Sequence, residues 1–183
     1  MQKKVSTLKL ILCVLPLVGL LALCILLYLA FDNDPRALPS VLIDKPVPAF
    51  ELKSLSGDQV FTEKSFLGKP WVLNIWASWC VECQKEVLEL EKIKNLSNIP
   101  MVGLDYKDEP DIAKRWLAQF GNPYDEIIED QPGLFGIDLG VYGVPETFII
   151  DKEGRIRYKL IGIITDEIIE TDIMPIINQL TAE

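Results

Sequence analysis

The feature that most constrains how this chain can fold is an uncharged, apolar run at residues 10–31, LILCVLPLVGLLALCILLYLAF. As a helix, a run of this length rises about 1.5 Å per residue, enough to cross the roughly 30 Å of a bilayer's hydrocarbon core. Pro16 and Gly19 lie inside it, and membrane helices tolerate both residue types. The run therefore predicts a transmembrane anchor at residues 10–31.

The charges on either side of the run predict its orientation. Lys3, Lys4 and Lys9 precede it, whereas Asp32 and Asp34 follow it. Because lysine and arginine favour the cytoplasmic side, residues 1–9 are expected in the cytoplasm. The rest of the chain is then expected on the outer face of the inner (cytoplasmic) membrane, in the periplasm or an equivalent extracytoplasmic space.

A cleaved signal peptide is the alternative interpretation of the same run. The apolar region of a signal peptide usually has about 7–15 residues and ends at a small-residue site. This run is longer, and LYLAFDND is a poor cleavage site. LALC at residues 21–24 resembles a lipoprotein processing site, but Leu23 stands where a small residue is wanted. The sequence therefore favours an uncleaved, single-pass anchor.

The charge of the remaining residues bears on the class of partner. The chain has 18 basic and 27 acidic residues, and three of the basic ones precede position 31. The part after the anchor therefore has 15 basic and 27 acidic residues, a net charge of −12. Binding to phosphates needs a basic surface, so a nucleic-acid partner is disfavoured. The negative charge suits a basic partner, or keeps the domain soluble.

Residues 32–45 are predicted to be a linker, and residues 46–183 a globular domain large enough to form a core without disulfide crosslinks. Strands are expected in PAFEL, DQVFT, WVLNIW (71–76), MVGLDY (101–106), DEIIED, ETFIID and RIRYKLIG. Apolar spacing predicts helices at 80–95, at 109–121 and at roughly 166–180. The order indicates an α/β fold, with a central mixed sheet and helices on both faces.

The cysteines are the candidate reactive residues, because the chain has four of them and no histidine. Cys13 and Cys24 lie in the apolar run, where cysteine behaves as a small apolar residue. Cys80 and Cys83 lie in the domain, three positions apart. A structural zinc site usually needs two such pairs, or a pair plus histidines, and the sequence has neither. A disulfide that closes so short a loop stabilises little, so the pair is predicted to be redox-active.

The position of the pair agrees with this prediction. A predicted strand ends at Trp76, a short loop follows, and Cys80 opens a predicted helix. Unpaired N–H groups at a helix start favour a thiolate and lower its pKa. Cys80 is therefore expected to be the exposed nucleophile. Cys83, one turn further on, is expected to be the inner thiol that resolves a mixed disulfide.

The motifs around the pair carry a resemblance to a known family. NIWASWCVEC resembles the active site of the thioredoxin superfamily. YKDEPDIAKRWLAQFGNPY and DLGVYGVPETFIIDKEGRIRY are similar to one branch of it, the membrane-anchored thiol:disulfide interchange proteins of the CcmG/DsbE type, which act in cytochrome c biogenesis. The similarity covers nearly all of residues 40–170. GVPET together with GNPY is far more specific than the CxxC pair alone.

The resemblance implies a fold, an activity and partners. The fold is thioredoxin-like, with an N-terminal β-hairpin extension and a central insertion. The activity is that of a protein disulfide oxidoreductase, a reductant that keeps the haem-attachment cysteines of apocytochrome c, or of a maturation partner, reduced. Electrons are expected from a transmembrane thiol carrier, because a reductant outside the cytoplasm works in an oxidising compartment. No metal and no cofactor are expected beyond the Cys80–Cys83 disulfide.

The resemblance also implies supporting residues. Pro145 matches a cis-proline beside the cysteines, whose expected effect is to turn the backbone of Val144 towards an extended substrate. Asn74 matches a position where ordinary thioredoxins carry a buried aspartate that helps take the proton from the inner cysteine. Because asparagine cannot ionise, another acid or water must take that proton.

Glu86 and Glu146 match acidic positions that the family places near its active site, and the alternative interpretation of both is solvated surface charge. Negative charge near a thiolate raises its pKa, which suits a reductant better than a strong oxidant. Val81 stands where many relatives have proline, so the sequence leaves the redox potential open.

Three aromatic residues near the motifs have different expected places. Trp79 is expected to shield the cysteines and contact the partner, whereas Trp76 is expected in the core. Tyr142 has two open interpretations, as loop packing or as part of a substrate groove.

Other functions compatible with the same motifs are a general extracytoplasmic disulfide reductase and a thiol peroxidase of the same fold. A peroxidase usually sets its reactive cysteine in a threonine-rich context without WCxxC. A non-enzymatic haem-handling module is the third alternative. The absence of histidine removes the commonest axial haem ligand, although methionine, tyrosine and cysteine remain.

Overall fold

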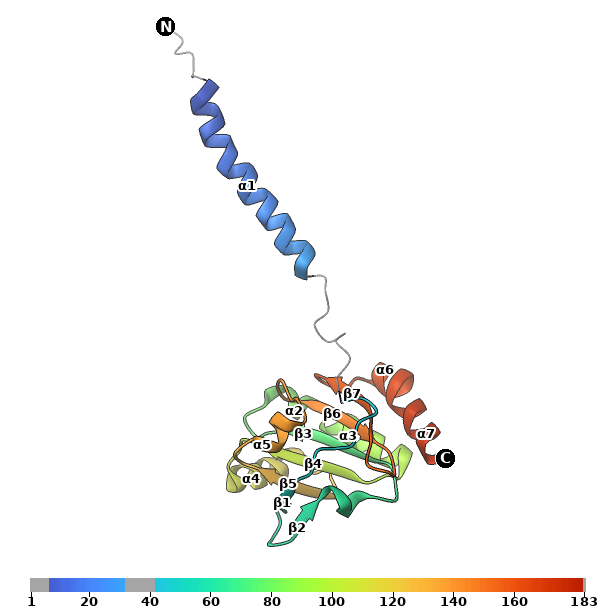
Figure 1. Cartoon of the computed structure of the whole chain (residues 1–183). Coiled ribbons are helices and arrows are strands. Elements are labelled where there is room, and N and C mark those ends of the chain that lie inside the picture. Colours follow the sequence, from blue (N-terminus) through green and yellow to red (C-terminus); the bar gives the residue numbers. More distant parts are fainter. Residues whose placement is uncertain (1–6, 32–41, 183) are drawn as a thin grey trace. The chain divides into compact units, whose positions relative to one another are not determined.

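The structure is a computed structural model that describes residues 7–31 and 42–182 (Figure 1). The chain divides into two compact units, residues 1–38 and residues 39–183. The predicted cytoplasmic segment 1–9 and linker 32–45 lie largely outside the described residues. Both therefore stay predictions.

The described part of the first unit is the helix α1 (Thr7–Phe31), which covers the predicted anchor and has Pro16 inside it. Its side chains are described for residues 14–28, and all of these are exposed. Within the described residues, no helix was found that is long and apolar enough to cross a membrane. The anchor at residues 10–31 stays a prediction.

The second unit is built on a five-stranded mixed sheet in the order β5–β4–β3–β6–β7. The central strand β3 (Trp71–Trp76) pairs in parallel with β4 (Met101–Tyr106) and antiparallel with β6 (Glu146–Ile150). β5 (Glu126–Asp130) continues the parallel side, and β7 (Ile156–Ile161) continues the antiparallel side. β3 and β4 are buried along their whole length, as continuous apolar strands in the middle of a covered sheet should be.

A separate hairpin, β1 (Glu51–Lys53) and β2 (Val60–Thr62), precedes this sheet and confirms the expected N-terminal extension. The backbone N–H of Leu55 donates to the carbonyl of Ile127 (2.9 Å), which ties the hairpin to β5. The helical segments are η2 (Glu63–Phe66), α2 (Val81–Lys85), α3 (Val87–Ser97), α4 (Pro110–Phe120), α5 (Leu134–Asp138), α6 (Asp166–Ile168), η3 (Ile169–Ile173) and α7 (Met174–Ala182). The central insertion that the resemblance implies stays a prediction.

Each face of the sheet packs a separate hydrophobic core. Because side chains alternate along a strand, Trp76 of β3 faces one core and Ile75 faces the other. The first core contains Cys80, Cys83 and apolar residues of α3, α4 and α7, and we call its side of the sheet the cysteine face. The second contains Phe61 of the hairpin and residues of α5, and we call its side the hairpin face. This division decides which side chains can act on the cysteines.

Two predicted helices are interrupted in the structure. The helix expected at 80–95 is divided at Glu86 into α2 and α3, where the Glu86 side chain turns into the core. The helix expected at 166–180 contains the π-helical segment η3 immediately before α7. Pro175 explains that irregularity, because proline has no N–H to donate to the carbonyl four residues earlier.

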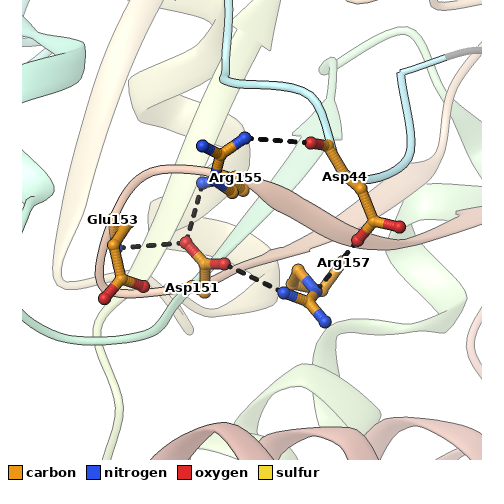
Figure 2. A network of polar contacts seen from close by, with 5 residues as sticks. All are labelled: Asp44, Asp151, Glu153, Arg155 and Arg157. Atoms are coloured by element: carbon orange, nitrogen blue, oxygen red, sulfur yellow. Dashed lines mark hydrogen bonds and ion pairs between the residues drawn. The ribbon is translucent and has the colours of Figure 1, made fainter.

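A polar network joins the start of the domain to the turn between β6 and β7 (Figure 2). Asp151 accepts hydrogen bonds from the backbone N–H groups of Glu153 (3.0 Å) and Arg155 (2.8 Å). Its second oxygen pairs with Arg157 (3.4 Å), which also pairs with Asp44 (3.2 Å). The Arg155 guanidinium donates to the backbone carbonyl of Asp44 (3.2 Å). The network therefore fixes the chain entering the domain against the edge strand β7.

Asp151→Ala is expected to lower the free energy of unfolding by about 1–3 kcal/mol, because two backbone N–H groups and the Arg157 guanidinium lose the buried carboxylate that accepts from them. Guanidinium unfolding of the oxidised chain measures this. Glu153→Gln is the matched control, because the exposed Glu153 side chain takes no part in the network. Equal losses in the two variants would contradict the role given to Asp151.

Candidate active site

The predicted redox pair lies at the start of α2, which follows β3 after a short loop. Cys80 and Cys83 form a disulfide. Cys80 is the N-cap of α2, and its sulfur accepts a hydrogen bond from the backbone N–H of Cys83 (3.0 Å). The same N–H would stabilise a Cys80 thiolate once the disulfide is reduced.

The expected exposure of Cys80 is wrong in the disulfide form. Cys80 is only 6% exposed and Cys83 only 2% exposed. The neighbours Trp79 and Val81 are exposed instead, whereas Trp76 is fully buried, as expected. A partner that approaches the disulfide therefore meets the exposed side chains of Trp79 and Val81.

Trp79 is held in place beside the pair. Its indole Nε1 donates to the backbone carbonyl of Lys107 (3.1 Å). A cleft of about 510 Å³ opens next to it, lined by Ser78, Trp79, Lys107, Asp108, Glu109, Ile112 and Gln131. The cleft gives a partner's chain room beside the cysteines.

Asn74, the residue that replaces the usual buried acid, is the centre of a buried hydrogen-bond network on the cysteine face. Its amide nitrogen donates to the Glu86 carboxylate (3.0 Å) and to the Thr147 hydroxyl (3.0 Å). Its amide oxygen accepts from the Tyr124 hydroxyl (2.6 Å). Thr147 lies directly opposite Asn74 in the β3–β6 register. The asparagine therefore positions Glu86, three residues after Cys83.

Glu86 is buried, so its interpretation as solvated surface charge is wrong. It is 1% exposed, and its second carboxylate oxygen accepts from the backbone N–H of Ile164 (3.0 Å). Burial raises the pKa of Glu86 to about 7, although the hydrogen bonds from Ile164 and Asn74 oppose that rise. A carboxyl with this pKa can give or take a proton near neutral pH.

Glu146 is also buried, but its side chain points to the other face of the sheet. Thr147 faces Asn74, so the preceding residue must face the hairpin side. The Glu146 carboxylate accepts from the backbone N–H groups of Tyr142 (2.7 Å) and Gly143 (3.3 Å) and pairs with Lys159 (2.9 Å). The structure therefore does not bring Glu146 together with Glu86, and it gives Glu146 a part in holding the loop before Pro145.

Glu146→Gln is expected to lower the free energy of unfolding by about 3–5 kcal/mol, because it leaves the buried Lys159 ammonium without a counter-charge. Lys159 and Glu146 side chains are 5% and 0% exposed. The double variant with Lys159→Met should recover most of the loss. Denaturant unfolding of both single variants and the double variant measures the coupling, and simple additivity would contradict a buried ion pair.

The Val144–Pro145 peptide bond is cis, as the resemblance implies. Val144 is half-buried and packs against the core that contains both cysteines. Tyr142 is almost fully exposed, with the Lys159 ammonium 5.0 Å from its ring centre. Its interpretation as loop packing alone is therefore disfavoured.

Comparison with known proteins identifies the family. Residues 43–173 match the Redoxin family. The chain is 43% identical over 159 residues to the thiol:disulfide interchange protein DsbE of Pseudomonas fluorescens biotype C, covering 87% of this chain and 88% of that protein. It is 45% identical over 149 residues to DsbE of Yersinia pestis, covering 80% and 79%. The chain belongs to the thiol:disulfide interchange proteins of the DsbE type.

Solved structures support the fold of this DsbE-type chain. A secreted thiol-disulfide isomerase from Corynebacterium glutamicum superposes with a TM-score of 0.65 at 21% identity, covering 80% of this chain and 96% of that one. A thio-disulfide isomerase from Thermus thermophilus superposes with a TM-score of 0.60 at 24% identity, covering 75% and 97%. The fold is thioredoxin-like, and the chain is a protein disulfide oxidoreductase that exchanges disulfides through its CxxC pair.

Sequence reasoning missed several residues of this DsbE-type site. Asp108 holds the loop before Cys80, since its carboxylate accepts from the backbone N–H and from the hydroxyl (2.8 Å) of Ser78. Asp108 follows β4, and the carboxyl ends of the parallel strands β3 and β4 lie at one edge of the sheet, so its place could have been predicted. Tyr124 and Thr147 belong to the GNPY and GVPET motifs, but the motifs do not show that both residues bind Asn74, which lies far from them in the sequence.

No site for a metal ion was found in the part of the chain that the structure describes, where no group of three or more histidine, cysteine, aspartate or glutamate side chains is suitably placed. The thiol of Cys24 is free and exposed. Cys13 lies among the residues whose side chains are not described.

Proposed function

We propose that this DsbE-type chain is a membrane-anchored, extracytoplasmic reductant of cytochrome c maturation. It keeps the haem-attachment cysteines of apocytochrome c, or of a maturation partner, in the thiol form. The observation that carries the proposal is the buried Glu86 carboxyl close behind the CxxC pair, held by Asn74 and Ile164. The similarity of the GVPET and GNPY motifs to the CcmG/DsbE branch supports the choice of partner.

The exchange needs only the two thiols of the reduced chain. The Cys80 thiolate attacks one sulfur of the partner's disulfide, forming a mixed disulfide and releasing one partner thiolate. Cys83 loses its proton and attacks the Cys80 sulfur, which breaks the mixed disulfide and releases the second partner thiolate. The partner gains two electrons and takes up two protons, and the chain is left with the Cys80–Cys83 disulfide.

Glu86 suits this direction of electron flow. Once ionised, it places a negative charge on the cysteine face and disfavours a thiolate there. A less stable dithiol form is a stronger reductant. Near neutral pH the same carboxyl can accept the proton that Cys83 loses, which is the task of the acid that Asn74 replaces.

The oxidised chain must be reduced again after each turnover. We propose a transmembrane thiol carrier as the electron donor and no cofactor beyond the cysteine pair. The uncharged run at residues 10–31, which falls within α1, supports an anchor that holds the domain beside such a carrier. The full chain should stay with the membrane fraction after a high-salt wash, and a soluble form beginning near Asp32 would contradict the anchor.

The test of the proposed function compares substrates for the reduced full chain in detergent. The disulfide form of a peptide with a CxxCH haem-attachment motif should be reduced faster than a CxxC peptide from another kind of protein. Equal rates would indicate a general disulfide reductase. Consumption of hydrogen peroxide at a rate above that of the peptide would replace the proposal with a thiol peroxidase.

A further inference from the structure

A second buried acid lies on the cysteine face, and the exchange reaction described above does not use it. Asp105 is 2% exposed and lies on β4, directly beside Trp76 of β3 and Glu129 of β5 in the sheet register. One of its carboxylate oxygens is buried without a hydrogen-bond partner among the described residues. A buried carboxylate in this condition is costly as an anion.

Asp105 interacts with Asp108, which is buried as well. Asp108 accepts from the backbone N–H and hydroxyl of Ser78 and from the backbone N–H of Glu109 (2.8 Å). Several donors favour the ionised form of a carboxyl, whereas Asp105 has an oxygen with none. Two adjacent buried carboxylates repel each other, and burial raises the pKa of Asp105, one of whose oxygens has no donor among the described residues.

The loop that Asp108 holds leads directly to the reactive cysteine. Ser78 stands two residues before Cys80, whose backbone N–H donates to the carbonyl of Ala77 (3.1 Å). We propose that Asp105 is a positioning residue of the redox centre: its protonated carboxyl donates to Asp108, keeps Asp108 bonded to Ser78, and so holds the loop that presents Cys80. When Asp105 ionises, the two carboxylates repel each other and the loop is released.

The groups around Asp105 set the pH at which this happens. Burial is the largest cause of its raised pKa, about 8, and the charges of Asp108 and Glu129 raise it further. Tyr124, on the same face, has a raised pKa to which the Asp105 charge contributes. Burial raises the pKa of Glu129 itself, whereas the positive charges of Lys114 and Lys53 lower it and so favour its ionised form. The loop is therefore held at neutral pH and released in mildly alkaline solution.

The first experiment follows the amide resonance of Ser78 in the oxidised full chain by NMR between pH 6 and pH 10. The cysteines do not titrate in the disulfide form, so they cannot cause a transition. The expected result is a transition near pH 8 that Asp105→Asn abolishes, because the amide donates to Asp108 but cannot ionise. A transition that survives Asp105→Asn at the same pH overturns the proposal.

Two further variants make the test specific. Glu129→Gln removes a neighbouring negative charge and should move the Ser78 transition to lower pH, whereas an unmoved transition counts against Asp105. Asp130→Asn is the matched control, since Asp130 is a buried acid at the end of β5 that binds the backbone of Gly136 (2.8 Å). It should leave the transition where it is. Because Glu129 is only partly buried, Glu129→Gln is expected to fold. The proposal can therefore be tested even if Asp105→Asn does not fold.

The second experiment measures exchange between the reduced full chain and glutathione disulfide at pH 7. Asp105→Leu removes the donor to Asp108 and should slow exchange by up to about tenfold, the rate equivalent of one hydrogen bond. Asp105→Asn should restore most of that rate. Unchanged exchange in Asp105→Leu overturns the proposal. The inference depends on the CxxC exchange and not on the cytochrome partner, so its failure would leave the proposed function untouched.

Discussion

Cys83→Ser is expected to leave the chain covalently joined to its partner, with multiple turnover abolished. Cys80 is the N-cap residue whose sulfur accepts the Cys83 N–H, and it is the less buried member of the pair. Its thiolate therefore attacks first, and without Cys83 no thiol of the chain is placed to break the mixed disulfide. Non-reducing gels of cell extracts, with mass spectrometry of the joined species, measure the trapped complex.

Cys80→Ser is the matched variant, because it removes the other sulfur of the same pair. It should lose turnover without trapping a partner, since Cys83 is only 2% exposed, against 6% for Cys80. Cys24→Ser controls for the free thiol in α1 and should leave trapping by Cys83→Ser unchanged. Trapping by Cys80→Ser and none by Cys83→Ser would reverse the two roles.

Glu86→Gln is expected to change how stability depends on pH. In the folded chain the pKa of Glu86 is raised from 4.5 to about 7. The neutral carboxyl therefore favours the folded state. This contribution to the free energy of unfolding is fully present below about pH 4.5 and is lost as the pH rises through 7, by about 3 kcal/mol at most. Glutamine cannot ionise, so the variant escapes that loss. Guanidinium unfolding of the oxidised chain at pH 5 and pH 8 measures the difference.

The difference in stability between Glu86→Gln and the natural chain should depend on the pH. At pH 5 the amide places a donor against the Ile164 N–H or the Asn74 amide, so the variant should be about 1–3 kcal/mol less stable than the natural chain. At pH 8 the gap should close or change sign. A gap of constant size would contradict a buried Glu86 with a raised pKa.

The same substitution should move the redox potential. Above pH 7 the natural chain carries a Glu86 charge that disfavours the thiolate, and the variant does not. The potential of Glu86→Gln should be less negative by up to about 30 mV, which corresponds to one pKa unit for a two-electron couple. Glu146→Gln is the control on the hairpin face and should leave the potential unchanged. Equal shifts in both variants would contradict the separation of the two acids by the sheet.

Much of the fold could be predicted from local patterns. The apolar sequences at 71–76 and 101–106 became buried central strands because both faces of the sheet are covered. The helix at 110–120 begins with proline and ends before Gly121, as such helices do. The division of the helix at Glu86 could not be predicted, because the apolar spacing continues across it. Hydrogen bonds to Asn74 and Ile164, distant in sequence, hold the side chain there.

The candidate site also has a part that the sequence predicts and a part that only the fold shows. The cysteine pair could be predicted, because its strand, loop and helix lie within one short segment of the chain. Asn74 showed that the usual acid is absent, but only the fold shows that it binds Glu86, Tyr124 and Thr147. The sequence paired Glu146 with Glu86 as two acids of one site. The alternation of β6 places Glu146 on the opposite face of the sheet.

The most direct test of the proposed function is the content of haem-stained c-type cytochromes in cells whose only copy of this gene carries both Cys80→Ser and Cys83→Ser. We expect c-type cytochromes to be lost and to return when a small thiol reductant is added to the medium, because the missing step is a reduction. The natural sequence on a plasmid should also restore them, whereas Glu153→Gln in the natural chain should cause no loss. Normal cytochrome levels in the double variant would contradict a role for this CxxC pair in cytochrome c maturation.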